Sequence, residues 1–436
     1  MKIINYNKIK SAAGGREPFA TPAGVRVILD EVRERGDVAV KGYTQKFDGV
    51  KLDAFRIDKK EFAESLSAMD GETVSALEEA AKNLEVFARR QLEQLRDFRF
   101  EIRPGVLTGQ RVVPLERVGV YVPGGNFPLV SSLLMGAVPA RVAGVKELVV
   151  CTPPGPDGRV QPVMLAAAAI AGVDELYTIG GAQAVGAMAY GTETIKRVDK
   201  IVGPGNRYVT AAKKEVYGTV GIDFIAGPSE VMVIADDSAD PGWIAADLLA
   251  QAEHDLLAVA QLVTPSPVLA ERVKKEIEKQ LAGLSTKEIA AKSIERNGCI
   301  VLVETLAQAI DYANIQAPEH LELQVEEPEV YQNKLSSYGT LFIGKYAAEV
   351  LGDYSSGLNH TLPTSGAARY TGGLSVRDFV KILTTLQVTE EGIKQIGKEA
   401  RSIARLEGLS AHAQAVSVRF ASGGSPRGLP AGHGLF

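Results

Sequence analysis

The chain contains little cysteine and little histidine. Its two cysteines, Cys151 and Cys299, each lie beside a run of β-branched apolar residues, which is typical of buried strands. The sequence therefore favours neither a disulfide framework nor a thiolate metal site. Five histidines are present, and the first 253 positions contain none. Any chemistry that uses histidine must therefore come from the C-terminal part of the chain.

Long apolar runs and long runs of one charge are also missing. No uncharged stretch approaches the roughly 20 residues that span a bilayer, and the N-terminus has no apolar core of signal-peptide length. The 48 Lys and Arg residues nearly balance the 53 Asp and Glu residues, for a formal net charge of -5. This balance argues against a nucleic-acid surface. We expect a cytoplasmic protein that acts on small molecules, with no nucleic-acid or membrane partner.

What is present predicts the α/β class. Apolar residues make up 45% and charged residues 23% of the 436 positions, an ordinary composition for a globular chain of more than one domain. Predicted strands cover 119–122, 147–152, 175–179, 200–202, 230–235, 258–263, 299–303, 321–325 and 339–343. Predicted helices between them cover 128–142, 162–171, 182–190, 206–216, 240–255, 267–284 and 306–315. Further helices are predicted at 21–35, 70–98, 389–407 and 409–419. The alternation favours two Rossmann-like parallel-sheet domains that face a cleft, with helical N-terminal and C-terminal extensions.

Four parts of the chain follow from this pattern. Residues 1–117 form a mainly helical arm that packs with the second sheet domain. Residues 118–229 form the first Rossmann-like domain and residues 230–378 the second. Residues 379–436 form a helical tail, whose last residues, about 15 in number, are rich in Gly and Pro and are expected to be mobile.

Glycine turns follow three strands of the first domain. They are VPGGN at 122–126, IGGAQ at 179–183 and VGPGN at 202–206. None matches the dinucleotide or Walker pattern, so each alone is equally an ordinary strand-to-helix turn. Three such turns at the carboxyl ends of strands in one sheet favour a nucleotide crevice, because glycine lets the backbone approach a phosphate closely.

Metal-capable side chains gather in the second half of the chain. Gln251 and His254 are three residues apart in a predicted helix, so both lie on one face and could converge on one ion. The alternative is a polar helix end. Asp353 lies in a glycine-bounded loop, where an aspartate more often caps a turn. His360 is either a ligand or a loop histidine, and His412 follows a predicted helix end.

Glu319 and His320 adjoin just before a predicted strand. A carboxylate and an imidazole are the commonest groups for proton transfer in enzymes, although adjacent acid and base residues are also frequent on surfaces.

Taken together in their order and spacing, these motifs resemble the histidinol dehydrogenase family over nearly the whole chain. The segments that carry the resemblance are RVGVYVPGG at 117–125, GPGN at 203–206, AGPSE at 226–230, QAEHD at 251–255, APEHL at 317–321, GDY at 352–354, NHTLPT at 359–364 and EGLSAH at 407–412.

The resemblance implies a reaction and its cofactors. Family members oxidise L-histidinol through an aldehyde to L-histidine, using two NAD+ in succession and one zinc ion per subunit. By this analogy, His320 takes the alcohol proton, and Glu319 activates the water that adds to the aldehyde. Zinc has an orienting role toward the substrate's imidazole and amine nitrogens. The implied zinc ligands are Gln251, His254, Asp353 and His412.

The resemblance also implies the binding residues and the assembly. Substrate contacts carry over to Ser229, Gln251, His254, His320, Asp353, Glu407 and His412. NAD+ contacts carry over to Tyr121, Gln183 and Asn206, on the first sheet domain. Family members are homodimers with shared active sites, in which the C-terminal tail with Glu407 and His412 reaches the other subunit.

Other functions remain open from the sequence. Related dehydrogenases act on other alcohols such as sulfonated propanediols, and the segment 367–374 is similar to that branch. The carboxylate of Glu407 argues against this substrate, since it suits an amine and repels a sulfonate. A zinc hydrolase would leave the glycine turns without a purpose. A non-catalytic nucleotide-binding protein would not need Glu319 and His320.

Overall fold

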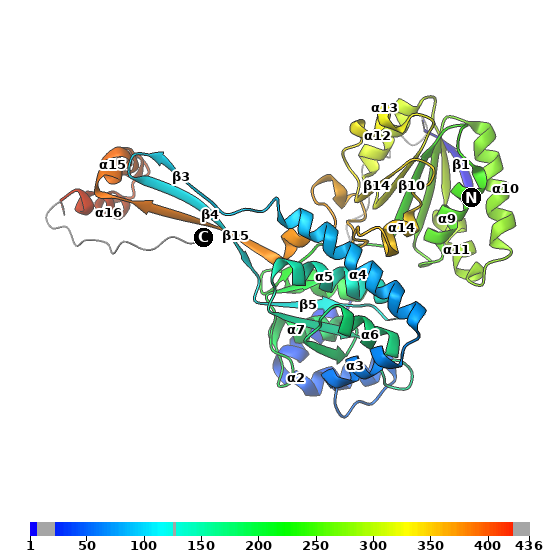
Figure 1. Cartoon of the computed structure of the whole chain (residues 1–436), viewed down its shortest axis with the longest axis horizontal. Helices are drawn as coiled ribbons and strands as arrows, with labels where there is room; N and C mark the ends of the chain where they lie inside the picture. Colours follow the sequence, from blue (N-terminus) through cyan, green and yellow to red (C-terminus); the bar gives the residue numbers. More distant parts are fainter. Residues whose placement is uncertain (7–21, 125–127, 422–436) are drawn as a thin grey trace. The chain divides into compact units, whose positions relative to one another are not determined.

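The computed structural model describes residues 1–6, 22–124 and 128–421. Predictions that fall on Gly125, Asn126, His433 and the C-terminal end lie outside these described residues. The chain forms two compact units (Figure 1). The first comprises Met1–Leu92 and Pro114–Phe379, and the second comprises Glu93–Val113 and Val380–Phe436.

One six-stranded sheet of the first unit has the strand order β2-β7-β6-β5-β8-β9. The strand β2 is antiparallel to its neighbour, and the others are parallel. The strands are β2 (Arg56–Ile57), β5 (Arg117–Tyr121), β6 (Glu147–Thr152), β7 (Glu175–Thr178), β8 (Lys200–Val202) and β9 (Gly221–Ile222). The helices between them are α5 (Val130–Ala143), α6 (Pro162–Ile170), α7 (Gly181–Tyr190) and α8 (Arg207–Val216). From β5 the chain adds β6 and β7 on one side of the sheet, and it then returns to add β8 and β9 on the other side of β5.

A second six-stranded sheet has the order β1-β12-β11-β10-β13-β14, and all its strand pairs are parallel. When the edge strands β1 and β2 are left out, the strands of both sheets follow the same order of connection. In this sheet, the chain adds β11 and β12 on one side of β10 and then β13 and β14 on the other side. The strands are β1 (Lys2–Asn5), β10 (Glu230–Ala235), β11 (Val259–Thr264), β12 (Cys299–Leu302), β13 (His320–Gln324) and β14 (Thr340–Ile343). The helices are α9 (Pro241–Ala252), α10 (Pro267–Leu281), α11 (Lys287–Asn297), α12 (Leu306–Gln316), α13 (Pro328–Tyr331) and α14 (Glu349–Tyr354). The predicted α/β class with parallel sheets is confirmed.

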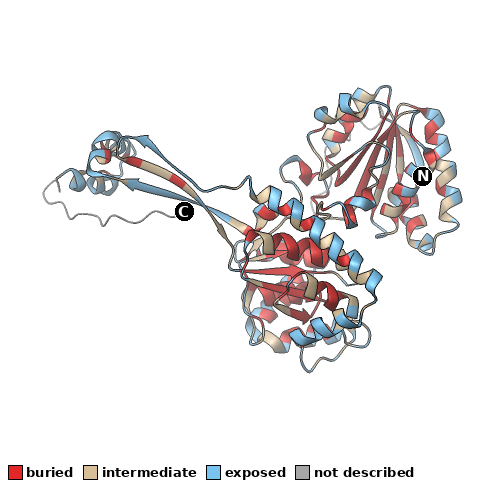
Figure 2. Cartoon of the chain, in the orientation of Figure 1, coloured by how far each residue is buried: buried red, intermediate tan, exposed pale blue. Residues whose placement is uncertain are grey.

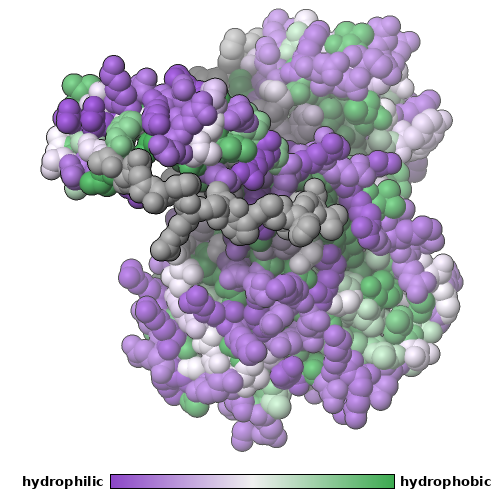
Figure 3. All heavy atoms as spheres, turned by 60° about the vertical axis from the view of Figure 1, so that its left-hand side comes forward, coloured by the Kyte–Doolittle hydropathy of each residue, from purple (hydrophilic) through white to green (hydrophobic). Residues whose placement is uncertain are grey.

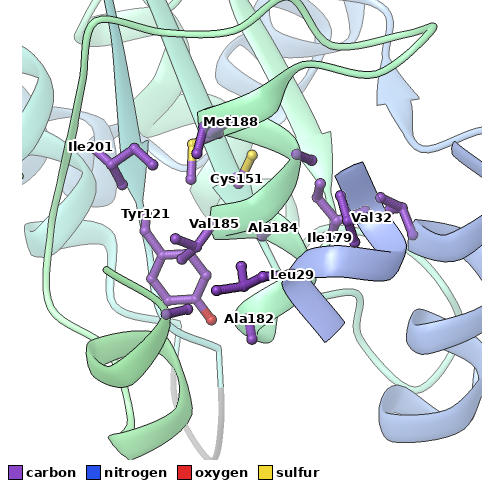
Figure 4. Packing of buried hydrophobic residues seen from close by; sticks show 14 of the residues in the cluster. Leu29, Val32, Tyr121, Cys151, Ile179, Ala182, Ala184, Val185, Met188 and Ile201 are labelled. Carbon is purple, nitrogen blue, oxygen red and sulfur yellow. The ribbon is translucent and has the colours of Figure 1, made fainter. Parts of the chain in front are cut away.

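Burial explains why the strand sequences are so apolar. The central strands are covered on both faces, and every residue of β10 is buried (Figure 2). Parallel strands in this position need apolar side chains throughout, and they connect through helices that pack closely. Figure 4 shows such packing around the first sheet, where Tyr121 of β5 lies among Val185 and Met188 of α7 and Leu29 of α2 (Val25–Asp48).

The N-terminal arm requires a correction. Its helices α2, α3 (Lys59–Ala68) and α4 (Gly71–Leu92) pack on α7, α6 and α5, which belong to the first sheet. The physical reason is the apolar stripe of α2, which includes Leu29 and is buried in the same core cluster as the side chains of α7. Only the short strand β1 extends the second sheet, where the whole arm was predicted to pack.

The second unit contains strands that the sequence analysis does not predict. They form a sheet in the order β15-β4-β3, with β3 (Phe98–Arg103), β4 (Val106–Pro114) and β15 (Val380–Val388). Helices α15 (Glu390–Leu406) and α16 (Ser410–Ala421) follow. The predictions of a mainly helical arm at 1–117 and a helical tail at 379–436 are therefore corrected. The arm also contains β3 and β4, and the tail begins with β15. Strands β3 and β15 are largely exposed within this chain, and β4 is mostly half-buried, so all three lack the buried apolar runs that identify the other strands.

The face of the molecule seen in Figure 3 carries mainly hydrophilic side chains with hydrophobic ones between them. Throughout the described part of the chain, no helix combines the length and apolarity needed to cross a membrane.

Candidate functional site

The candidate pair Glu319 and His320 lies at the amino end of β13, beside the amino end of its neighbour β10. His320 begins β13, and Glu230 begins the neighbouring parallel strand β10. Glu319, directly before β13, accepts a hydrogen bond at Oε2 from the backbone N–H of Glu230 at 2.8 Å. The backbone before Glu319 is strained, because Ala317 has a φ of 49° without being glycine. The strained residue therefore lies two positions before Glu319 and three before His320, in the turn that positions both side chains.

His320 is surrounded by carboxyl groups. Its Nδ1 lies 3.2 Å from the carbonyl oxygen of Glu230 and 3.3 Å from Glu349 Oε1. The same nitrogen is 3.8 Å from Glu319 Oε2. The other ring nitrogen, Nε2, lies 3.5 Å from Asp353 Oδ1. Since a carbonyl oxygen can only accept, these contacts favour a proton on Nδ1 and make Nε2 the ring nitrogen at which a second proton can be exchanged.

Helix α14 supplies two of these carboxylates. Glu349 and Asp353 are four residues apart on it, so they lie on one face. Both are buried, and together with His320 their ligand atoms lie within 4.8 Å of one another. Sequence reasoning names Asp353 and misses Glu349. The helical spacing to Asp353 could have found it, because a carboxylate at this distance shares the face of the candidate ligand.

Gln251 joins the group from α9. Its side chain is fully buried, and with the amide nitrogen facing Glu349, the amide donates to that carboxylate. Its oxygen then accepts from the backbone N–H of Glu230 at 3.2 Å. One carboxylate, Glu349, therefore contacts both the candidate ligand Gln251 and the candidate base His320.

The helical argument for Gln251 and His254 needs a correction. The helix α9 ends at Ala252, so His254 lies in the turn beyond it and is exposed. The chain keeps a tight turn there, because the His254 N–H donates to the Gln251 carbonyl at 3.3 Å. His254 is nevertheless near enough to Asp353 for its charge to lower the pKa of that carboxyl.

Burial and charge work against each other in this site. Burial raises the pKa of Glu319 to about 8 and that of Glu349 to about 8, with the charge of His320 opposing both shifts. Burial alone would lower the pKa of His320, but the charges of Glu349, Glu319 and Asp353 outweigh it and raise this pKa well above its ordinary value. Burial alone would raise the pKa of Asp353, but the imidazole of His320, with Nε2 3.5 Å from Asp353 Oδ1, lowers it.

A second layer of carboxyl groups lies behind Glu349. Its backbone N–H donates to Glu322 Oε1 at 3.1 Å. Glu322 and Asp247 are both buried and share the side-chain amide of Gln324, at 2.6 Å and 3.1 Å. Burial raises the pKa of each of these two carboxyl groups. No local sequence pattern predicts this layer, since its members come from separate elements.

The candidate nucleotide residues line one cavity of about 910 Å³ in the first unit. Tyr121, Gln183 and Asn206 all belong to its wall. Tyr121 is buried, and its hydroxyl accepts from the Gly181 N–H at 3.1 Å. Asn206 caps α8 by accepting from the N–H groups of Tyr208 and Val209. Gln183 Oε1 is buried and has no hydrogen-bond partner among the described residues.

The remaining candidates lie outside this group of contacts. Ser229 directly precedes Glu230 and is half-buried. His360 binds Ser132 Oγ through Nε2 at 3.0 Å, so it is a bonded loop histidine in the described structure. Glu407 and His412 belong to the second unit, where both are exposed.

Comparison with known proteins settles the family. A family model for histidinol dehydrogenase matches residues 17–420. The chain belongs to the histidinol dehydrogenase family. It is similar to histidinol dehydrogenases from Geobacillus kaustophilus, at 48% identity over 91% of this chain and 94% of that protein, and Aquifex aeolicus, at 51% identity over 91% of both.

The histidinol dehydrogenase likeness extends to three dimensions. A crystal structure of histidinol dehydrogenase from Elizabethkingia anophelis matches with a TM-score of 0.90 at 38% identity. The match covers 97% of this chain and 98% of that one. Both compact units, and not only the sheets, therefore have counterparts in the histidinol dehydrogenase fold.

Proposed function

We propose that the chain is a zinc-dependent NAD+ oxidoreductase that converts L-histidinol through L-histidinaldehyde to L-histidine. The observation that carries the proposal is the buried group of Glu319, His320, Gln251 and Asp353. It combines proton-transfer groups with metal-capable atoms in one place, as a metal-assisted alcohol oxidation requires.

The proposed nucleotide site is the cavity beside the first sheet. It lies beside the ends of β5 and β8, where Tyr121 ends β5 and Asn206 follows β8. These neighbouring strands are the point at which the order of the strands in the sheet changes direction. Open α/β sheets commonly bind ligands at such a point. We infer that both sheets belong to Rossmann-like domains facing one cleft, with NAD+ on residues 118–229 and zinc on residues 230–378.

The proposed ligand set fits zinc. Gln251 and Asp353 offer oxygen, and His254 and His412 offer nitrogen, a donor set without thiolate that also suits a substrate-binding ion. Asp353 Oδ1 is buried without a hydrogen-bond partner in the described structure, which supports its assignment as a ligand. The bound ion would orient the substrate's imidazole and amine nitrogens.

The proposed proton transfers use two residues in succession. The Nδ1 atom of His320 contacts the Glu230 carbonyl and the Glu349 carboxylate. Its Nε2 would therefore take the alcohol proton while the first hydride passes to NAD+. Glu319 would then remove a proton from the water that adds to the aldehyde carbon. With that proton removed, the hydrate is a monoanion; it would pass the second hydride to a second NAD+, and the carboxylic acid so formed would lose its proton to solvent to give L-histidine.

The direct test follows NADH absorbance after mixing the protein with zinc, NAD+ and L-histidinol. We expect two NADH for each histidinol consumed. Absence of reduction with histidinol, together with reduction by a sulfonated propanediol, would overturn the substrate assignment.

Glu349→Gln tests the contacts around the proposed ligand. Loss of this carboxylate should release zinc about 10-fold to 100-fold more readily, because partners that orient a metal ligand typically contribute that much affinity. Metal retention after dialysis against a graded chelator measures the effect. Glu322→Gln is the matched control, since Glu322 is equally buried but contacts the backbone of Glu349 instead of Gln251. Equal zinc loss in both variants would contradict the assigned contact.

We also infer a homodimer that shares its active sites. The second unit exposes many apolar side chains, which favours a covering partner. They include Phe98, Phe100, Ile102, Ile382, Leu383, Leu386, Leu406 and Leu409. Glu407 and His412 are exposed on the same unit and would complete the site of the other subunit.

Mixed dimers test this arrangement. Asp353→Ala and His412→Ala should each be inactive alone. Co-expressed, they should recover about a quarter of the wild-type activity, because half of a statistical mixture is heterodimer and each heterodimer has one intact site of two. If both residues instead served a site in their own chain, the mixture would remain inactive.

A cytoplasmic location, without nucleic-acid or membrane partners, stays part of the proposal. Both cysteines are free, which suits a reducing compartment. Nearly balanced charge supports a small-molecule substrate.

A further inference from the structure

The glycine turn after β8 is held by a buried ion pair. Lys213 lies on α8 and Asp223 directly follows β9, and their side chains are only 4% and 0% exposed. The two side chains form an ion pair with each other. Removing both charges from water is costly, and their mutual attraction offsets this cost only when further hydrogen bonds satisfy both groups. Such a pair therefore needs an explanation beyond packing.

Both members of the pair also bind the backbone of Gly203. Lys213 Nζ donates to the Gly203 carbonyl at 2.9 Å, and Asp223 Oδ2 accepts from the Gly203 N–H at 2.8 Å. Asp223 Oδ1 accepts from the Phe224 N–H at 2.7 Å. Gly203 is the first residue beyond the last paired position of β8, where the sheet no longer satisfies its backbone. The ion pair replaces both missing partners.

Gly203 also fixes how closely the turn approaches β5. Its φ is 111°, a conformation that favours glycine, and a Cβ atom there would lie 2.1 Å from the carbonyl oxygen of Tyr121. Three residues later, Asn206 caps α8 and lines the cavity together with Tyr121 and Tyr208. The position of Gly203 therefore determines where the backbone of the turn and the side chain of Asn206 lie in the cavity wall.

We propose that Lys213 and Asp223 are positioning residues for NAD+ binding. They hold the 203–206 turn against β5 so that Asn206 and the amino end of α8 face the cofactor, and neither touches the cofactor itself. This inference deepens the proposed function and rests on the assignment of the cavity to NAD+.

A paired substitution separates this role from stability. Removing one partner leaves a buried unpaired charge, so Lys213→Met or Asp223→Leu alone is expected to destabilise the fold strongly. Changing both together removes both charges, and such replacements are often neutral or stabilising. The double variant K213M/D223L avoids the unpaired buried charge but leaves the Gly203 backbone groups without these partners, so its unfolding temperature should fall less than that of either single variant. It lacks the two bonds to Gly203, so the KM for NAD+ should rise about 10-fold or more, whereas the KM for L-histidinol should stay near its wild-type value.

An ion pair at the other end of the same strand provides the control. Lys200 begins β8 and binds Asp378 at 2.8 Å, away from the 203–206 turn. The double variant K200M/D378L should keep the wild-type KM for NAD+. A wild-type KM for NAD+ in K213M/D223L, with the fold intact, would overturn the proposal.

Calorimetric titration with NAD+ distinguishes failure of this inference from failure of the proposed function. Wild-type protein that binds NAD+ but does not oxidise L-histidinol would refute the substrate and leave the positioning role testable by the Kd of the variants. An unchanged Kd for NAD+ in K213M/D223L would refute the positioning role alone. Wild-type protein that fails to bind NAD+ would refute both.

Discussion

Asp353→Ala is expected to produce a folded protein that retains no zinc and oxidises L-histidinol more than about 100-fold more slowly than the wild type. Asp353 is the proposed ligand whose buried oxygen lacks a hydrogen-bond partner in the described structure, 3.5 Å from His320. Its removal deletes an anionic donor and frees the ring of His320 from its nearest contact at Nε2. The loss of zinc affinity should exceed that in Glu349→Gln, because Asp353 is a proposed ligand, whereas Glu349 only contacts the proposed ligand Gln251.

Metal analysis and NADH formation measure the two effects on one sample, and a thermal unfolding curve establishes that the variant is folded. Glu253→Ala is a suitable control, since this carboxylate lies beside His254 but binds Thr286 at 2.5 Å. Zinc retained at the wild-type level in Asp353→Ala would show that the ion, if any, is held elsewhere.

Glu319→Gln should separate the two oxidations. Oxidation of added L-histidinaldehyde is expected to fall about 10²-fold to 10⁴-fold, the usual contribution of a general base. The alcohol step should change little, because His320 and its contacts with Glu230 and Glu349 remain. With L-histidinol as substrate, the variant should form one NADH for each molecule and release the aldehyde.

The pH dependence of the aldehyde step supplies a second measurement. Burial raises the pKa of Glu319 to about 8, and a base must be deprotonated to act. The wild-type rate should therefore increase as the pH rises through about 8, and this increase should be absent in Glu319→Gln. Equal loss of both oxidation steps in the variant would show that the roles given to Glu319 and His320 are wrong.

The sequence predicts the buried strands well and the exposed ones poorly. The predicted limits of 147–152, 200–202 and 230–235 are those of β6, β8 and β10. These strands are short, mainly apolar runs between turns, a pattern typical of a buried strand. By contrast, β3 lies exposed, yet Phe98, Phe100 and Ile102 alternate with charged residues along it. This period of two was a readable signal for a strand, and the preceding helical pattern obscured it.

At the candidate site, the sequence identifies residues that form motifs and misses residues that only the fold brings together. Glu319, His320 and Asp353 lie in short segments typical of the family, and the structure brings them into contact. Glu349 and Glu322 stand in no motif. Their importance depends on the pairing of β13 with its neighbours and on the packing of α14, which no local pattern encodes.

The edge strand β1 has a consequence for the order in which the protein folds. All strands of the first sheet are present once the chain has been synthesised to Ile222, because β9 is its last strand. The second sheet differs, since Lys2 pairs with Cys299 and Asn5 with Leu302. Pairing across such a long sequence separation closes late. Strand β1 must therefore remain unpaired until the chain has been synthesised as far as Leu302.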